Sequence, residues 1–509
     1  MSVQRTGGWL PGLAALALLI GLAAAVYGFI GRSGFNEDEF FQLTFVHEPL
    51  SSFLLLFLRL DQHPPFHFLQ LMPWAAISEN DHWMLANSLL WHGISCAVIW
   101  AVGRAWLGRT AGWLAVAFFA LMPQAISASN TLRFYAMIPA LALLAWWLHV
   151  WLLSDRQRPA RWWWALGLVQ LALGYSHAIA FYFVFWIALA AALQRRFGAD
   201  PAPAPWRRWF AVQGITLLLL VPQVLLTAGR AYMARGAGGD GNQDPGGLID
   251  HFGGMTAGWG MQWGEARLAG ALLFAAALLL GLRERRTRWL ALVMLVGPYG
   301  GSLLIGLVLA PMFKTPVYSA MLLPFACLCL AGGLLALGER AGAWASAAVL
   351  AAMAAFVFPA TAHLNRGISP YVPMAAELKR VLRPGDVVVV PKLYLYWATL
   401  RYAVQPNWGA PLAVLPDLSS SWQSLAKRLG PAWSERLRLL PRTNHIQHQG
   451  VTYVVGEDAR RESAGAQRVW VLERKQYPSQ VQLDPGLQSR GVVYRVGQPE
   501  LLELQLHER

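Results

Sequence analysis

Acidic residues are concentrated in one short segment of this chain. Seven of the fifteen aspartates and glutamates in the first 360 positions lie within residues 32–82. The segment contains a run that includes Asp38 and Glu39 and, further on, Asp61 and His63 followed by two prolines. Apolar stretches flank the segment on both sides, and carboxylates beside a bilayer are costly and usually functional. We therefore predict a chemical site in this segment.

Asp38 and Glu39 directly follow the first apolar stretch. An aspartate in this position can act as a general base that deprotonates an acceptor hydroxyl, and Glu39 can hold the acceptor or the loop by hydrogen bonding. The alternative is structural, because acids near a helix start are favoured by capping and by the helix dipole. The adjacent Glu37 is an alternative candidate for the general base.

Asp61 and His63 precede Pro64 and Pro65, which fix an extended entry and can start a helix. There, His63 can donate a hydrogen bond to a phosphate or sugar oxygen, and Asp61 can position the acceptor or the loop. A capped helix start at the membrane interface is the alternative.

Three further residues fit the handling of a phosphate, and a fourth fits the positioning of the acceptor or the loop. Arg133 lies at a junction between apolar stretches, where its planar fork suits phosphate oxygens and Tyr135 can orient it; the alternative is a snorkelling anchor. Lys314, in a short turn, can neutralise a phosphate or be an ordinary loop lysine. His177 interrupts another apolar stretch and is a candidate for positioning the acceptor or loop, although junction histidines are more often structural.

No pair of His, Cys or Glu residues shows metal-ligand spacing. The predicted chemistry therefore requires no cofactor, and the sequence leaves dependence on a divalent cation open.

The composition is that of a polytopic α-helical membrane protein. Of the 509 residues, 56% are hydrophobic and only 13% are charged, against about 25% charged in soluble domains. A helix that crosses a bilayer needs about 20 apolar residues. The predicted spans are about eleven, at residues 9–31, 83–106, 111–127, 135–153, 162–176, 178–193, 209–228, 266–282, 289–310, 317–337 and 342–360. The first lacks a small-residue cleavage site, so we interpret it as a retained anchor.

Basic residues predict the orientation of the spans. With the N-terminus in the cytoplasm, inner connectors hold fourteen arginines, whereas outer connectors hold seven basic residues before the C-terminal region. This bias is the positive-inside pattern, and it explains most of the net charge of +14 without a nucleic-acid partner. The acidic segment and the C-terminal domain then face the periplasm or the exterior. The three cysteines all lie in predicted spans and offer no disulfide framework.

Two domains are predicted, a membrane domain at residues 1–360 and a periplasmic α/β domain at 361–509. Beyond residue 361 the sequence is less apolar, and short strand-like runs alternate with helix-like stretches. The strand-like runs are 387–390, 451–455, 469–472 and 492–496, and the helix-like stretches are 373–382 and 421–429. The glycine-rich stretch 229–265 is predicted to be a long outer loop that covers a site or connects spans.

The order of these features resembles the GT-C superfamily of polyprenyl-phosphate-sugar-dependent glycosyltransferases. The order is a span, Asp-Glu, Asp-x-His-Pro-Pro, a span, a small basic turn, a span, and a Ser-x-x-x-Arg-x-Tyr junction from Ser129 to Tyr135. The likeness is to the bacterial branch related to protein O-mannosyltransferases and lipid A aminoarabinose transferases. It covers residues 9–190 and, more loosely, Lys314–Pro324 and the segment from Arg383 to Val387.

The resemblance implies a role for several residues. Asp38 matches the catalytic aspartate of the family's first loop, and Glu39 matches its companion. The second half of that loop matches Asp61 and His63, and a Glu-Ala-Arg-x-Tyr-like segment matches Arg133 and Tyr135.

This chain departs from the family pattern in two places. Thr131 stands where relatives often have Glu, and Val317-Tyr318 stands where an Arg-Tyr pair is common. The second departure leaves Lys314 as a substitute cation.

Together, the residues and the resemblance predict an inverting glycosyltransferase in the bacterial inner membrane. It would move a sugar from a polyprenyl-phosphate donor to an envelope lipid, glycan or protein on the periplasmic side, among membrane lipids. Lipid phosphate is a good leaving group, so the reaction needs a base for the acceptor and cations for the phosphate.

The sequence also permits comparison with three other functions. A transporter or flippase of lipid-linked saccharides would place acids in mid-span and show repeats, and neither occurs. A non-catalytic envelope assembly partner would be expected to lose the first-loop acids. A polysaccharide ligase or polymerase would typically lack an acidic loop directly after its first span.

Overall fold

The computed structural model divides the chain into two compact units. It describes residues 9–46, 64–198, 204–234, 251–254, 256–257, 264–308, 320–364, 369–391, 393–404, 445–455, 459–475, 481–496 and 502–509. The helical unit comprises Met1–Gly31, Gln62–His67 and His82–Asn365, and the second unit comprises Arg32–Asp61, Phe68–Asp81 and Arg366–Arg509. The second unit therefore joins most of the acidic segment to the C-terminal region.

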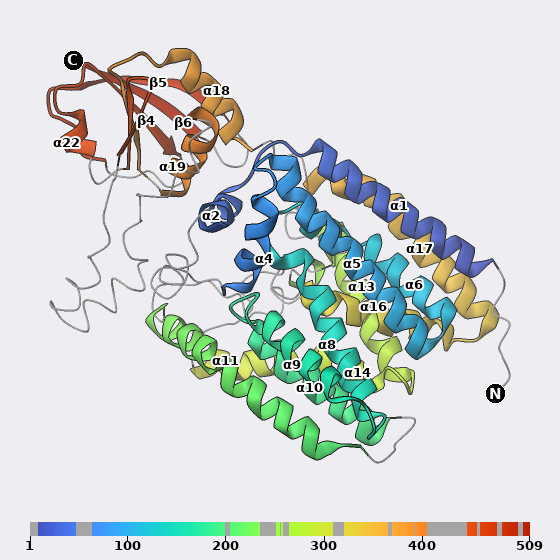
Figure 1. Ribbon diagram of the computed structural model, residues 1–509. Coiled ribbons are helices and arrows are strands. Elements are labelled where there is room, and N and C mark those ends of the chain that lie inside the picture. The colour runs from blue at the N-terminus through green and yellow to red at the C-terminus, as the bar shows by residue number, and fades with distance from the viewer. Residues whose placement is uncertain are drawn as a thin grey trace. The chain divides into compact units, whose positions relative to one another are not determined.

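The helical unit is a bundle of apolar helices (Figure 1). The helices are α1 (Leu10–Gly31), α5 (Asp81–Leu107), α6 (Arg109–Ala120), α7 (Pro123–Ser129), α8 (Ile138–Leu153), α9 (Ala160–Gly174), α10 (Ala180–Phe197), α11 (Trp206–Ala234), α13 (Gly264–Arg283), α14 (Arg288–Leu290), α15 (Gly297–Val308), α16 (Leu323–Leu335) and α17 (Glu339–Leu364). Short helices η1 (Phe134–Ala136) and η2 (Ala291–Val296) join some of them.

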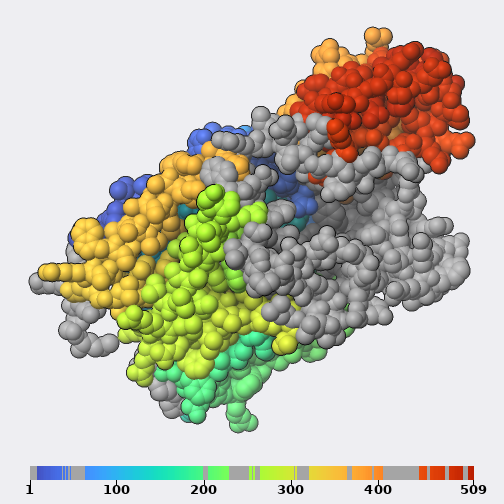
Figure 2. All heavy atoms as spheres, turned by 180° about the vertical axis from the view of Figure 1, so that it is seen from behind, coloured from blue at the N-terminus to red at the C-terminus, as the bar shows by residue number. Residues whose placement is uncertain are grey.

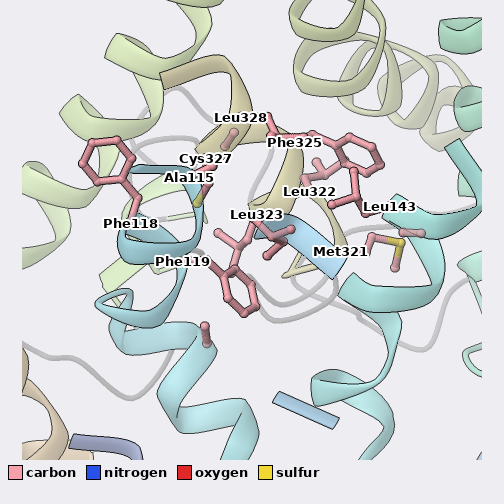
Figure 3. Packing of buried hydrophobic residues seen from close by; sticks show 14 of the residues in the cluster. Ala115, Phe118, Phe119, Leu143, Met321, Leu322, Leu323, Phe325, Cys327 and Leu328 are labelled. Atoms are coloured by element: carbon pink, nitrogen blue, oxygen red, sulfur yellow. The ribbon is translucent and has the colours of Figure 1, made fainter. Parts of the chain in front are cut away.

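The core of the bundle lies where α6, α8 and α16 meet. Phe118 and Phe119 from α6, Leu143 from α8, and Leu323 and Phe325 from α16 are all buried there (Figure 3). Nearly every residue of α16 is buried, because a helix that is apolar on all sides packs against neighbours all round.

Seven of the described helices are long and apolar enough to cross a membrane, or eight if the bent pair α6 and α7 forms one span. The bend is 67°, and it falls where Pro123 begins α7 after an extended residue. Each of the eleven predicted spans overlaps a helix, but α9 has 15 residues and α16 has 13, fewer than the about 20 that a bilayer needs. The polytopic helical fold is confirmed, and the number eleven stays a prediction.

The second unit contains a six-stranded mixed sheet in the order β2-β3-β1-β4-β6-β5. The strands are β1 (Val387–Val390), β2 (His445–His448), β3 (Val451–Val455), β4 (Arg468–Arg474), β5 (Gln488–Val496) and β6 (Leu502–Glu508). Strand β1 pairs in parallel with β3 and β4, and the other pairs are antiparallel. All four valines of β1 are buried, as expected for a central parallel strand.

Helices α18 (Tyr371–Val381), α19 (Leu393–Thr399) and α22 (Ala459–Ser463) accompany the sheet, and a short π-helical turn, η4 (Leu400–Val404), follows α19. The acidic segment contributes α2 (Glu37–Val46), and α4 (Phe66–Ala75) follows further along the chain. In the space-filling view of Figure 2, the residues nearest the C-terminus, coloured red, form one continuous surface.

The predicted α/β domain is confirmed for most of its elements. The four strand-like runs correspond to β1, β3, β4 and β5, and the helix-like stretch 373–382 corresponds to α18. The sequence analysis did not predict β2 and β6. The stretch 421–429 lies outside the described residues.

Candidate active site

The first turn of α2 is held by a reciprocal pair of hydrogen bonds. The Glu39 N–H donates to Asn36 Oδ1 at 3.1 Å, and the Asn36 N–H donates to Glu39 Oε2 at 2.7 Å. This is a capping box, in which a cap residue and a glutamate three positions later satisfy each other's backbone groups. The sequence Asn36-Glu37-Asp38-Glu39 therefore specifies where α2 begins.

The Glu39 side chain is fully buried in the second unit and also pairs with the guanidinium of Arg32. Arg32 Nε in turn donates to the carbonyl of Gly34 at 3.4 Å. The Glu39 carboxylate thus accepts from one backbone donor and one cation, both from its own loop. The sequence left open whether Glu39 holds the acceptor or the loop, and these partners favour the loop.

Asp38, by contrast, is exposed. It occupies the second position of α2, between two residues that the capping box fixes. An exposed carboxylate on a fixed helical turn can accept a proton from a hydroxyl that approaches from solvent. The side chain of Glu37 is not among those the structure describes, so its candidacy stays open.

The segment before α2 is bound to the C-terminal part of the second unit. Ser369 Oγ donates to the carbonyl of Phe35 at 2.6 Å, and the Phe35 N–H donates to Tyr402 Oη at 3.0 Å. Gly34, at φ +74°, would place a Cβ only 2.7 Å from Val372 Cγ2. A side chain at position 34 would therefore break this contact, so glycine is required by both conformation and space.

Aromatic side chains complete the attachment of α2. The ring centroid of Phe40 lies 5.4 Å from that of Tyr371 and 5.6 Å from that of Tyr402, and both pairs are edge-to-face. Phe40 is fully buried. Such pairs stabilise a contact by more than the area that they bury would suggest. Helix α2 is therefore held by packing against α18 and η4 as well as by its own loop.

A buried cluster of polar groups lies next to this contact. Arg401, only 2% exposed, forms an ion pair with Asp81 and donates to the carbonyl of Glu79 at 2.6 Å. Tyr402 Oη donates to Asp81 Oδ2 at 2.8 Å. Burial, and then the neighbouring Asp81 carboxylate, raise the pKa of the Tyr402 phenol. The phenol therefore stays protonated at neutral pH and keeps its hydrogen bond to Asp81.

Sequence reasoning missed Arg401, Tyr402 and Ser369. The only signal for this cluster was that Asp81 belongs to the acid-rich segment. Its partners lie 320 residues further along the chain, and no local pattern links them.

In the helical unit, the structure brings together Arg133, Tyr135 and His177 around Phe134. The guanidinium carbon of Arg133 lies 5.1 Å from the Phe134 ring centroid and 5.8 Å from that of Tyr135. The His177 ring lies 4.7 Å from Phe134 and 6.2 Å from Tyr135. Arg133 and His177 are both buried. A cation among aromatic rings is stabilised by their negative faces, and a guanidinium fork remains suited to phosphate.

The backbone at this junction is also fixed. Arg133 adopts an extended conformation and caps η1. Ser88 Oγ donates to the carbonyl of Thr131 at 2.7 Å, and Ser95 Oγ donates to that of Ala136 at 3.0 Å. Two serines of α5 therefore hold both sides of the segment that carries Arg133 and Tyr135.

The remaining predicted residues lie outside the described part of the chain. These are Asp61, His63 and Lys314, with most of the glycine-rich stretch 229–265. Their roles stay predictions. Among the residues that the structure describes, no group of three or more His, Cys, Asp or Glu could hold a metal ion.

We expect Glu39→Ala to lower the free energy of unfolding by about 1–3 kcal/mol, because it removes a cap bond and the partner of Arg32. Glu39→Gln keeps an oxygen for the Asn36 N–H and should lose less. The measurement is thermal unfolding of the purified protein, with Asn36→Ala as a matched change that removes the reciprocal bond. If Glu39→Ala were as stable as the wild type, the carboxylate would have a chemical role instead.

The fold and these contacts define the class of the protein: a polytopic helical membrane protein with a sheet-containing C-terminal region, to which a carboxylate-bearing helix is attached. The structure is similar to that of ArnT from Cupriavidus metallidurans in the apo state, with a TM-score of 0.55 and 14% identity over 98% of each chain. It is likewise similar to the same protein bound to undecaprenyl phosphate, with a TM-score of 0.53 and 13% identity over 98% of each chain.

A third similar structure is the oligosaccharyltransferase of Archaeoglobus fulgidus in the apo form, at a TM-score of 0.49 and 10% identity over 92% of this chain and 70% of that one. No family model matches the sequence, and no curated protein matches it. The likeness to ArnT extends over 98% of each chain and confirms that this chain has the fold that the sequence resemblance predicted.

Proposed function

We propose that this protein is a polyprenyl-phosphate-dependent glycosyltransferase that inverts the anomeric centre of the sugar it transfers. The observation that carries the proposal is an exposed carboxylate, Asp38, held on a capped helix in a chain with the fold of ArnT. The ArnT structure bound to undecaprenyl phosphate supports a polyprenyl phosphate as the leaving group.

In the proposed reaction, Asp38 takes the proton of an acceptor hydroxyl. The acceptor oxygen forms a bond to the anomeric carbon from the face opposite the phosphate, and the bond from that carbon to the phosphate oxygen breaks. The electron pair of the broken bond leaves with polyprenyl phosphate, and the proton stays on Asp38 until solvent removes it. One displacement inverts the anomeric centre.

The cations in this proposal stabilise the phosphate as its charge increases. Arg133 binds the phosphate with Tyr135 as its orienting partner, and His63 and Lys314 add donors. Asp61 and His177 position the acceptor or the loop. No step uses a metal.

The proposed location is the bacterial inner membrane, with the N-terminus in the cytoplasm and the C-terminal domain in the periplasm. The two-to-one excess of basic residues in the inner connectors supports this orientation. The acceptor would then be an envelope lipid, glycan or protein on the periplasmic side.

The test is a transfer assay with the purified protein and a panel of radiolabelled polyprenyl-phosphate sugars, with envelope extract as the source of acceptor. We expect one donor to lose its sugar in a reaction that requires Asp38. Tight binding of a lipid-linked sugar without turnover, equal in the wild type and in Asp38→Asn, would instead favour a transporter or an assembly partner.

A further inference from the structure

A cavity of about 650 Å³ lies between α9 and α11, and none of the residues assigned to the proposed reaction is among those that line it. The two helices lie side by side in Figure 1. Each lines the cavity with residues spaced three or four apart, from 160 to 171 in α9 and from 208 to 219 in α11. These residues are almost all apolar, and Trp164 and Leu168, at its edge, are each 65% exposed.

The floor of this cavity depends on Gly167. A Cβ at this position would lie 3.7 Å from Thr216 Oγ1 and 3.9 Å from Val212 Cγ1, which is ordinary van der Waals contact. A larger side chain would therefore extend into the cavity without breaking the backbone.

Behind the cavity, a network of polar side chains from α8, α9 and α11 joins α9 and α11. Gln170 Nε2 lies 2.9 Å from Gln213 Oε1 and 3.0 Å from His149 Nε2, and Trp209 Nε1 donates to His149 Nδ1 at 2.9 Å. At the far end, Tyr175 Oη donates to the carbonyl of Leu219 at 2.7 Å. These bonds keep the spacing of α9 and α11 constant along the cavity.

The opposite end carries positive charge. Arg158 and Arg208 both line the cavity there, beside the starts of α9 and α11. Arg158 packs over the ring of Trp151 at 4.1 Å and pairs with Asp155 at 3.4 Å. Both members of that pair are partly exposed, so the attraction is weak and screened. Arg208 makes a long contact of 3.5 Å to the carbonyl of Arg156.

We propose that this cavity binds a phospholipid with an anionic headgroup. The apolar walls take an acyl chain, since the volume falls in the range of ligand sites, and the two guanidinium forks bind the phosphate oxygens. A zwitterionic headgroup is disfavoured because its ammonium group is repelled by the same arginines. None of the residues of the proposed donor site lines the cavity, and the bound lipid is not consumed.

The test measures which lipids stay bound to the purified full-length protein by native mass spectrometry. The probes are phosphatidylglycerol and phosphatidylcholine with identical acyl chains, offered at equal concentration. We expect the wild type to retain phosphatidylglycerol on the order of tenfold more strongly, because two arginines favour a headgroup of net negative charge over a zwitterionic one.

Two variants and one control test the two parts of the cavity separately: the arginines that bind the headgroup and the apolar walls that bind the acyl chain. Arg158→Gln with Arg208→Gln should remove the preference, whereas Arg207→Gln, the neighbouring arginine that does not line the cavity, should leave it intact. Gly167→Leu should reduce retention of both lipids alike.

Equal retention of the two lipids by the wild type would overturn the proposal. So would a preference that Arg207→Gln weakens as much as the double variant does. If the double variant does not fold, Gly167→Leu still decides whether the cavity is occupied. Because no sugar donor is present, failure here is independent of failure of the proposed transferase activity.

Discussion

Asp38→Asn should abolish sugar transfer while leaving the protein folded. Asparagine is similar in shape but cannot take a proton, and loss of a general base lowers rates by about 10²–10⁴-fold. The Asp38 side chain is exposed, and the capping box uses Asn36 and Glu39, so the substitution leaves the cap of α2 intact, and thermal unfolding checks that the protein stays folded. Initial transfer rates at saturating donor measure the effect.

Two other carboxylates serve as controls for this experiment. Glu37→Gln changes the adjacent residue, and Asp155→Asn changes an exposed acid in the helical unit. Both should transfer sugar at wild-type rates. If Glu37→Gln abolished transfer and Asp38→Asn did not, the base would be Glu37, one position earlier in the same turn.

The second large effect is expected at the ion pair between Arg401 and Asp81. Arg401→Met should destabilise the second unit by about 1–3 kcal/mol, because it leaves the partly buried Asp81 carboxylate without its cation. Tyr402 bonds both to Asp81 and to the backbone of Phe35. Loss of Arg401 should therefore also loosen the segment that leads into α2, and transfer should fall with stability.

Thermal unfolding in detergent and protease resistance of the C-terminal region measure this loss. Asp81→Asn combined with Arg401→Met should recover part of it, because no buried charge is left unpaired. Arg380→Ala breaks an exposed pair with Glu377 and should cause no measurable change. Wild-type stability of Arg401→Met together with lost transfer would place Arg401 at the substrate instead.

The sequence predicted the elements whose signals are local. The four valines of β1 indicate a buried strand, and apolar stretches of sufficient length indicate spans such as α1 and α17. Strand β2 escaped prediction because His445–His448 is short, and its assignment depends on pairing with β3. Strand β6 also escaped prediction, although Leu502, Leu504 and Leu506 alternate with polar residues, which is a local strand signal.

The sequence by itself determined that carboxylates gather after the first span and that Asn36 and Glu39 can form a cap, because these are properties of composition and of residues three apart. Only the tertiary structure decided which carboxylate faces solvent. Successive residues of a helix point about 100° apart, so the packing that buries Glu39 beside Arg32 leaves Asp38 exposed. The residues on either side of this turn, Phe35 and Phe40, are held by Ser369, Tyr371 and Tyr402, more than 300 residues away. No local pattern specifies contacts across such a distance, because they form only when the chain buries its apolar and polar groups together.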